Sequence, residues 1–165
     1  MKAITPQSLT SETFSRFGAV IEASDDREPV TINSGTCLKY PDLALPDCTM
    51  EGGRAAVHIY RAKPMDMPIV ITGFERHLCG SQAFIPLSGR PYLVVVAPVG
   101  DFDLDKVRVF RAEGNQGVQY NRGTWHHFCL ALEAESEFLV IDRSASTPDC
   151  EEVDLPPEQQ FVIAG

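Results

Sequence analysis

Short apolar runs broken by turn residues dominate the chain from residue 30 onward. The runs are rich in Val, Ile, Phe and Tyr and are separated by Pro, Gly and Asp, which is the pattern of β-strands joined by turns. The expected strands are VTINS, CLKY, AAVHIYRA, PIVITGFERH, SQAFIPLSG, PYLVVVAPV, VRVFRA, GVQYNRGTWHHF, FCLALE and SEFLVIDR. Many short strands at close spacing favour a closed or double-sheet β structure.

The N-terminal segment has a different pattern. Residues 7–17, QSLTSETFSRF, predict a short amphipathic helix that Ser8 or Thr10 caps. Phe14 and Phe17 fall three residues apart on one side of it, and Gly18 ends it. The following AVIEA is expected to form a strand.

Two other stretches are less regular. DFDLDKV, residues 101–107, predicts one helical turn or a loop, and the acidic, Pro-broken tail CEEVDLPPEQQFVIAG is expected to lie over the surface. No internal repeat, low-complexity tract or shift in composition marks a boundary. We therefore expect one domain over residues 1–165.

The charge balance limits the possible partners. The chain has 23 acidic and 14 basic residues, a formal net charge of -9. A nucleic-acid backbone requires a basic face, and an anionic membrane would repel this charge, so we expect neither partner. A small anionic substrate stays possible, because one or two local arginines can outweigh a distant negative surface.

The cysteines and the N-terminus favour a cytoplasmic protein. Five Cys are an odd number and form no C-x-x-C pair, while MKAITPQSLT lacks the pattern of a secretion signal. Reduced thiols are therefore expected. The longest apolar run, residues 93–99, is far shorter than the about 20 residues that a membrane helix needs.

Candidate chemistry gathers in FERHLCGSQAFIPLSG, residues 74–89. On a strand, Glu75 and His77 share one face while Arg76 points the other way. After a bend around Gly80, Gln82 restarts the alternation. Polar side chains that face the inside of a β structure must be paired or used by a ligand, so this segment predicts a pocket.

The spacing of these residues resembles the metal-binding motifs of cupin barrels. The first cupin motif is H-x-H, four residues, Glu, six residues and Gly; here Glu75-x-His77 is followed at the same spacing by Gln82 and Gly89. The second is P-x-G, two residues and His; here Asn121 replaces Pro, and His126 keeps its place. The resemblance implies a cupin-like double-stranded β-barrel with an altered ligand set.

More closely, the chain resembles the ureidoglycolate lyase family. The resemblance runs from about residue 8 to the tail, and its specific parts are the ERH and WHH segments. Leu78 and Phe128 stand where the family usually has Pro. The segments that carry it are INSG (32–35), Y-x-DLAL (40–45), RA (61–62), ERH-x-x-G-x-QAFIP (75–86), GV-x-Y-x-R (117–122), WHH (125–127) and FL-x-IDR (138–143).

The resemblance implies cleavage of (S)-ureidoglycolate to glyoxylate and urea in allantoin catabolism. It also implies a homodimer and, through the family's association with nickel, a divalent metal. The reaction needs a base near the hydroxyl, an acid near the departing nitrogen, and a clamp on the carboxylate. Exposed edge strands that need covering also favour a homodimer.

Residue chemistry assigns candidates to these tasks. Glu75, His77 and His126 are the candidates for proton transfer, with the identity of the base left open, and Gln82 can orient the ureido group. Arg61 is the favoured carboxylate clamp, because a guanidinium forms two parallel hydrogen bonds with a carboxylate. Further candidates for substrate binding are Tyr120, Arg122, Asn33 and Lys39.

The same side chains are candidate metal ligands. Glu75, His77, Gln82 and His126 could hold a divalent ion, since two His and a carboxylate resemble a facial ligand set. Gln is a poor ligand, so weak affinity is expected. Without a metal, these residues could still act by hydrogen bonding.

Several nearby residues are expected to be structural. Because His58 and Arg61 have opposite parity in AAVHIYRA, an inward Arg61 would place His58 outside. His127 should point away from His126, and Trp125 should pack. The pair Asp142 and Arg143 is expected to close a strand end, and Cys79 to be a bystander.

Two other functions compete with the lyase. A metal-dependent cupin isomerase or dioxygenase acting on another small acid would hold its metal tightly. A non-enzymatic cupin that binds a small ligand would need no acid–base pair.

Overall fold

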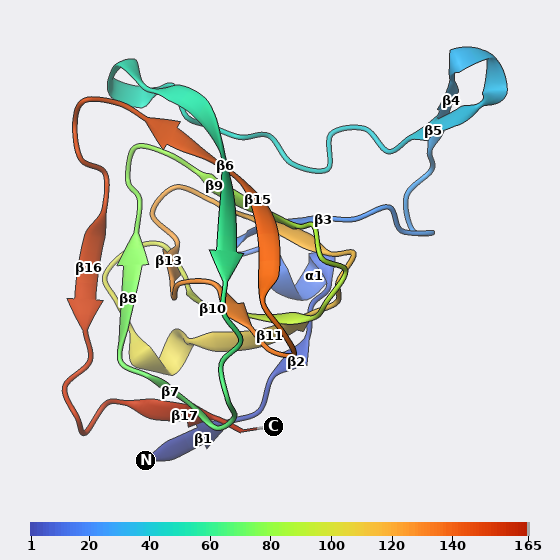
Figure 1. The fold of residues 1–165 in the computed structure, drawn as a ribbon. Coiled ribbons are helices and arrows are strands. Elements are labelled where there is room, and N and C mark those ends of the chain that lie inside the picture. Colours follow the sequence, from blue (N-terminus) through green and yellow to red (C-terminus); the bar gives the residue numbers. More distant parts are fainter. Residues whose placement is uncertain (165) are drawn as a thin grey trace.

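The computed structural model describes residues 1–164 and consists of two larger β-sheets that pack around a core, with two smaller sheets (Figure 1). One large sheet has the order β16-β8-β13-β10-β11-β2, with β14 also on β10, and the other has the order β3-β12-β9-β15-β6. The expected mainly β fold with a short N-terminal helix is confirmed. The elements are β1 Lys2–Ile4, β2 Gln7–Ser8, α1 Ser11–Phe14, β3 Gly18–Ile21, β4 Val30–Ile32, η1 Asn33–Gly35, β5 Cys37–Lys39, η2 Met50–Gly52, β6 Arg54–Ala62, β7 Ile69–Ile71, β8 Gly73–Arg76, β9 Gln82–Pro86, β10 Tyr92–Ala97, η3 Leu104–Lys106, β11 Arg108–Ala112, β12 Gly117–Tyr120, β13 Trp125–His126, β14 Leu130–Ala131, β15 Ser136–Ser144, β16 Glu151–Asp154 and β17 Phe161–Ile163.

Strand β10 lies between two apolar cores. Val94 and Val96 pack with Phe110 and Phe138 in the core between the two large sheets. The alternate residues of β10, such as Val95, pack in a second core against the small sheet β1-β17-β7. Because both faces of β10 are covered, its sequence is a continuous apolar run and does not alternate.

The N-terminal helix is shorter than the sequence predicts. Thr10 caps α1 by accepting a hydrogen bond from the Thr13 amide, and Phe14 and Phe17 enter the first core as expected. Residues 7–8 instead form β2, which pairs in parallel with β11. The backbone of residues 7–8 therefore pairs with a neighbouring strand and does not form a helical turn.

The acidic tail differs most from the expectation. It does not merely lie over the surface, because β16 pairs with β8, and β17 lies between β1 and β7. Phe161 and Ile163 are fully buried in the second core. The tail thus completes two sheets and covers the strand that carries Glu75.

Residues 25–47, here called the arm, project from the body of the molecule. The arm contains the hairpin β4–β5, which extends away from the two large sheets in Figure 1. No residue of the arm is buried.

Within the described residues, no helix has the length and apolar character needed to cross a membrane.

Candidate functional site

Two neighbouring strands of one large sheet, β8 and β13, bring Glu75, His77 and His126 together. His126 on β13 pairs directly with Glu75 on β8, and His77 follows β8. Ligating atoms of Glu75, His77 and His126 all lie within 4.8 Å of one another. The Glu75 Oε1 to His126 Nδ1 distance is 3.7 Å, and the two imidazole rings are 5.3 Å apart.

The hydrogen bonds of the two histidines indicate which ring nitrogen carries the hydrogen. His77 Nδ1 donates to the carbonyl of Asp149 at 2.7 Å, and His126 Nδ1 lies 3.3 Å from the carbonyl of His127. A carbonyl can only accept, so Nε2 of each neutral ring keeps its lone pair. Both Nε2 atoms are buried and have no partner among the described residues.

His126 is held in an apolar setting. It is 1% exposed, and its ring stacks on Tyr120 at 4.5 Å with an angle of 10°. Burial, with a smaller contribution from His77, lowers the pKa of His126 to about 3. The ring is therefore neutral near pH 7 and presents a lone pair, not a positive charge.

This donor set fits a divalent transition metal. Two imidazoles and one carboxylate form the group that such ions prefer, and the backbone carbonyls of Asp149 and His127 orient the rings. Gln82 Oε1 is also buried without a partner, which keeps it available as a further ligand or as an acceptor from a substrate. The orphaned lone pairs agree with the predicted ligand residues.

A cavity of about 520 Å³ opens beside this group. This volume lies within the range of small-molecule sites. Its lining side chains are Tyr60, Arg61, Ala62, Glu75, His77, Gln82, Phe84, Phe128, Cys129 and Asp142. Burial, together with the charges of Asp142 and Glu75, raises the pKa of Tyr60, so its hydroxyl stays protonated.

Strand β6 reverses the expected parity of His58 and Arg61. Its register with β15 puts His58 beside the buried Val140, on the inner face, where His58 Nε2 lies 3.1 Å from Asp142 Oδ1. Arg61 points the other way, pairs with Glu137 at 2.7 Å, and is 64% exposed. The prediction of an inward Arg61 and an outward His58 is wrong, and Arg61 reaches only the rim of the cavity.

Asp142 and Arg143 do not form the predicted ion pair, because neighbours on a strand face opposite sides. Asp142 contacts His58 and accepts a long hydrogen bond from Gln82 Nε2 at 3.4 Å. Arg143 instead donates to the carbonyls of Met50 and Thr147. Tyr60 and Asp142 are thus cavity residues that sequence reasoning missed, although the alternation of residues on β6 and β15 indicated their faces.

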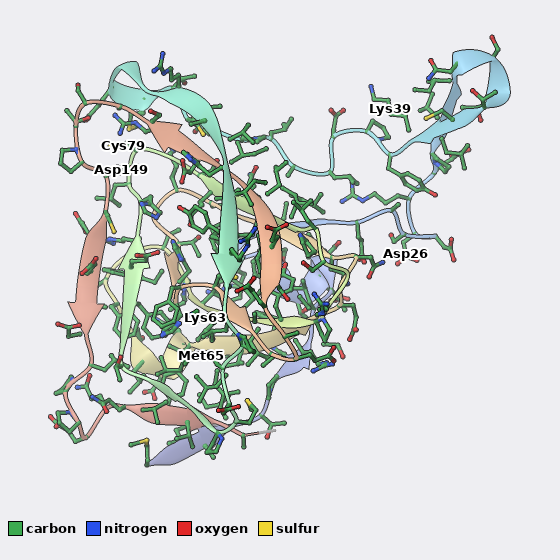
Figure 2. The ribbon with its side chains drawn as sticks, viewed as in Figure 1. Asp26, Lys39, Lys63, Met65, Cys79 and Asp149 are labelled. Atoms are coloured by element: carbon green, nitrogen blue, oxygen red, sulfur yellow. The ribbon has the colours of Figure 1, made fainter. Side chains whose placement is uncertain are left out.

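The other predicted substrate-binding residues are dispersed. Tyr120 is buried beneath His126 and supports that ring. Arg122 does not share its face, since β12 ends at Tyr120, and Arg122 pairs with Asp47 at 3.1 Å. Asn33 and Lys39 lie on the arm, far from β8 and β13 of their own chain (Figures 1 and 2).

The expected structural residues behave mostly as predicted. Trp125 is buried, donates to the carbonyl of Gly100 at 2.9 Å, and lies under the guanidinium of Arg76. His127 is buried as well, because the tail covers the opposite face of its sheet.

Cys79 lies beside Asp149 (Figure 2), and the Cys79 amide donates a hydrogen bond of 2.7 Å to the Asp149 carboxylate. Desolvation raises the pKa of the Cys79 thiol, and nothing in its surroundings makes it a reactive thiolate.

A second acidic group adjoins the site. Glu75 Oε2 lies 3.7 Å from Cys150 Sγ, and Cys150 lies 4.0 Å from Glu152. Desolvation and the two carboxylates raise the pKa of Cys150 to about 11. No local pattern predicts this contact, because it depends on the pairing of β16 with β8.

Comparisons with known proteins agree on one family. The family model for ureidoglycolate lyase matches residues 1–163. A ureidoglycolate lyase of Pseudomonas entomophila is 43% identical over 164 residues, covering 99% of this chain and 98% of the relative. One of Burkholderia mallei is 45% identical over 156 residues, covering 94% and 91%. Among solved structures, a sugar 3,4-ketoisomerase from Thermoanaerobacterium thermosaccharolyticum matches with a TM-score of 0.46 and 12% identity over 81% of this chain and 85% of that one.

Proposed function

Because the chain belongs to the ureidoglycolate lyase family, we propose that it cleaves ureidoglycolate to glyoxylate and urea in the cavity beside Glu75, His77, Gln82 and His126. One observation carries the assignment to this cavity. Three polar atoms, Nε2 of both histidines and Oε1 of Gln82, are buried without partners next to a carboxylate. Buried polar groups are costly unless a ligand uses them, so they support a site.

The reaction moves one proton and breaks one bond. The hydroxyl of ureidoglycolate loses its proton, its oxygen forms the carbonyl of glyoxylate, and the C–N electron pair leaves with nitrogen. That nitrogen gains a proton and becomes the second amino group of urea. A single carboxyl group that accepts the first proton and returns it to nitrogen balances the reaction.

Glu75 suits this role best. His126 is neutral and its pKa is about 3, so its lone pair can orient or bind but does not retain a proton near pH 7. Glu75 is partly exposed at the cavity and already lies beside His126. Gln82 can accept from a ureido N–H through its free Oε1.

A divalent metal held by Glu75, His77 and His126, with Gln82 as a possible fourth ligand, would supply positive charge to a substrate oxygen. Nickel is the ion that the family resemblance implies. Metal analysis of the purified protein identifies the ion and its stoichiometry.

The proposal extends to handling of the (S)-enantiomer in allantoin catabolism by a cytoplasmic homodimer. Five free thiols suit a reducing compartment. Val57 and Ile59 on the outer face of the edge strand β6 are exposed, and such an apolar edge favours a covering partner.

The test measures glyoxylate release from racemic ureidoglycolate, with and without chelator. Because the substrate decays spontaneously, buffer without enzyme gives the baseline. We expect release well above the baseline from the wild type and at the baseline from His77→Ala, whose folding is checked by circular dichroism. Wild-type release no faster than buffer would remove the lyase assignment.

A further inference from the structure

The cavity described above lacks a free positive charge for an anionic substrate. Its lining contains the carboxylates of Glu75 and Asp142. The only Lys or Arg in the lining of this cavity is Arg61, which faces outward and is bound by Glu137 and Glu135. A carboxylate that enters this cavity therefore meets negative charge and needs a cation from elsewhere.

The arm, residues 25–47, needs a partner surface for a different reason. Its hairpin consists of two strands of three residues, and an isolated two-stranded hairpin is marginally stable in water. Val30 and Leu38 on the hairpin are 51% and 57% exposed. Within the described chain, no part of the arm is buried, and it extends away from β8 and β13 (Figure 1).

The arm and the cavity complement each other. Lys39, at the end of β5, is exposed and forms no ion pair within residues 1–164 (Figure 2). The mouth of the cavity is bordered by the exposed aromatic rings of Phe128 and Tyr60. Although acidic residues outnumber basic ones over the whole arm, the unpaired Lys39 can bring one positive charge to the anionic cavity, and the exposed Val30 and Leu38 match its apolar rim.

We propose that a second copy of this chain completes the site: the arm of each protomer lies over the cavity mouth of its partner, and Lys39 supplies the cation that binds the substrate carboxylate. The inference rests on the proposed lyase function. A copy of this chain is the partner because one chain carries both unmatched surfaces, and a two-fold axis satisfies both at once. Asn33, at the tip of the same hairpin, is carried to the same entrance.

The first experiment is complementation between subunits. Lys39→Ala and His77→Ala chains carry different affinity tags, are coexpressed, and are purified as heterodimers through both tags. A heterodimer pairs the intact cavity of the Lys39→Ala chain with the intact arm of the His77→Ala chain. We expect about half of the wild-type glyoxylate release per dimer, since one of two sites is whole.

The parent variants and a control define the outcomes. Lys39→Ala homodimers should lose about tenfold or more in kcat/KM, mostly through KM, because a charge-assisted hydrogen bond is removed. Lys2→Ala, an exposed lysine of β1 distant from the arm, should match the wild type. Full activity of Lys39→Ala, or a heterodimer no more active than its parents, would overturn the inference.

Sedimentation tests the arm without relying on activity. The wild type should sediment as a dimer at micromolar concentration, and Leu38→Asp should shift toward a monomer while keeping its circular dichroism spectrum. A wild-type monomer, or a Leu38→Asp dimer as stable as the wild type, would refute the arm exchange even if the lyase assignment fails. An active wild type without complementation would refute only this inference.

Discussion

Replacing Glu75 by Gln tests the division of labour in the site. The change keeps the size of the side chain and removes its charge and its ability to accept a proton. Glu75 supplies the only carboxylate among the three side chains whose ligating atoms lie within 4.8 Å of one another. A histidine ring is neutral or cationic, so neither His77 nor His126 can replace Glu75 as an anion. His126 in particular is neutral and its pKa is about 3.

The size of the expected effect follows from this role. General acid–base catalysis contributes about 10²–10⁴-fold, which corresponds to about 3–5 kcal/mol of transition-state stabilisation. We expect Glu75→Gln to lower kcat by that factor, while the free energy of unfolding changes by less than about 1 kcal/mol because Glu75 is partly exposed.

The assay is glyoxylate release corrected for spontaneous decay, with urea denaturation measured in parallel. Glu152→Gln is the matched control, since Glu152 lies opposite Glu75 in the β8–β16 pairing and is exposed. The control should stay within about twofold of the wild type. A Glu75→Gln enzyme with kcat within threefold of the wild type, about 0.7 kcal/mol, would refute the assignment of the proton acceptor.

Three further predictions concern the core, the rim and the metal. Phe138→Ala should lower the free energy of unfolding by about 3–5 kcal/mol in urea denaturation, because this ring is fully buried against Tyr92; a loss below about 1 kcal/mol would contradict the packing. Arg61→Lys should change KM by less than about twofold, since its exposed pair with Glu137 contributes at most about 1 kcal/mol; a large rise in KM would restore Arg61 as the clamp. Elemental analysis should find a divalent metal in the wild type that His77→Ala fails to retain, and equal retention would exclude the predicted ligand set.

Much of the fold could be predicted from the sequence because strand signals are local. Apolar alternation and turn residues located most strands, and the even spacing of Glu75 and His77 indicated a shared face. The approach of His126 to Glu75 was predicted only through the resemblance, since it depends on the pairing of β13 with β8.

The errors share one physical origin. Alternation shows that His58 and Arg61 lie on opposite faces of β6, but only its pairing with β15 decides which face is inside. The tail was predicted to lie over the surface because its acidic composition is not typical of strands. It forms two strands, and their partners lie far away in the sequence. The charge of Lys39 made it a candidate for substrate binding, but nothing in the neighbouring sequence indicates how far it lies from Glu75. Only the structure places it on the arm.

A crystal structure of the protein with glyoxylate bound would show directly which residues form the active site. We predict glyoxylate in the cavity of about 520 Å³, in contact with Glu75, Gln82 and the free Nε2 atom of His77. Glyoxylate bound elsewhere, with this cavity closed by its own side chains, would contradict it.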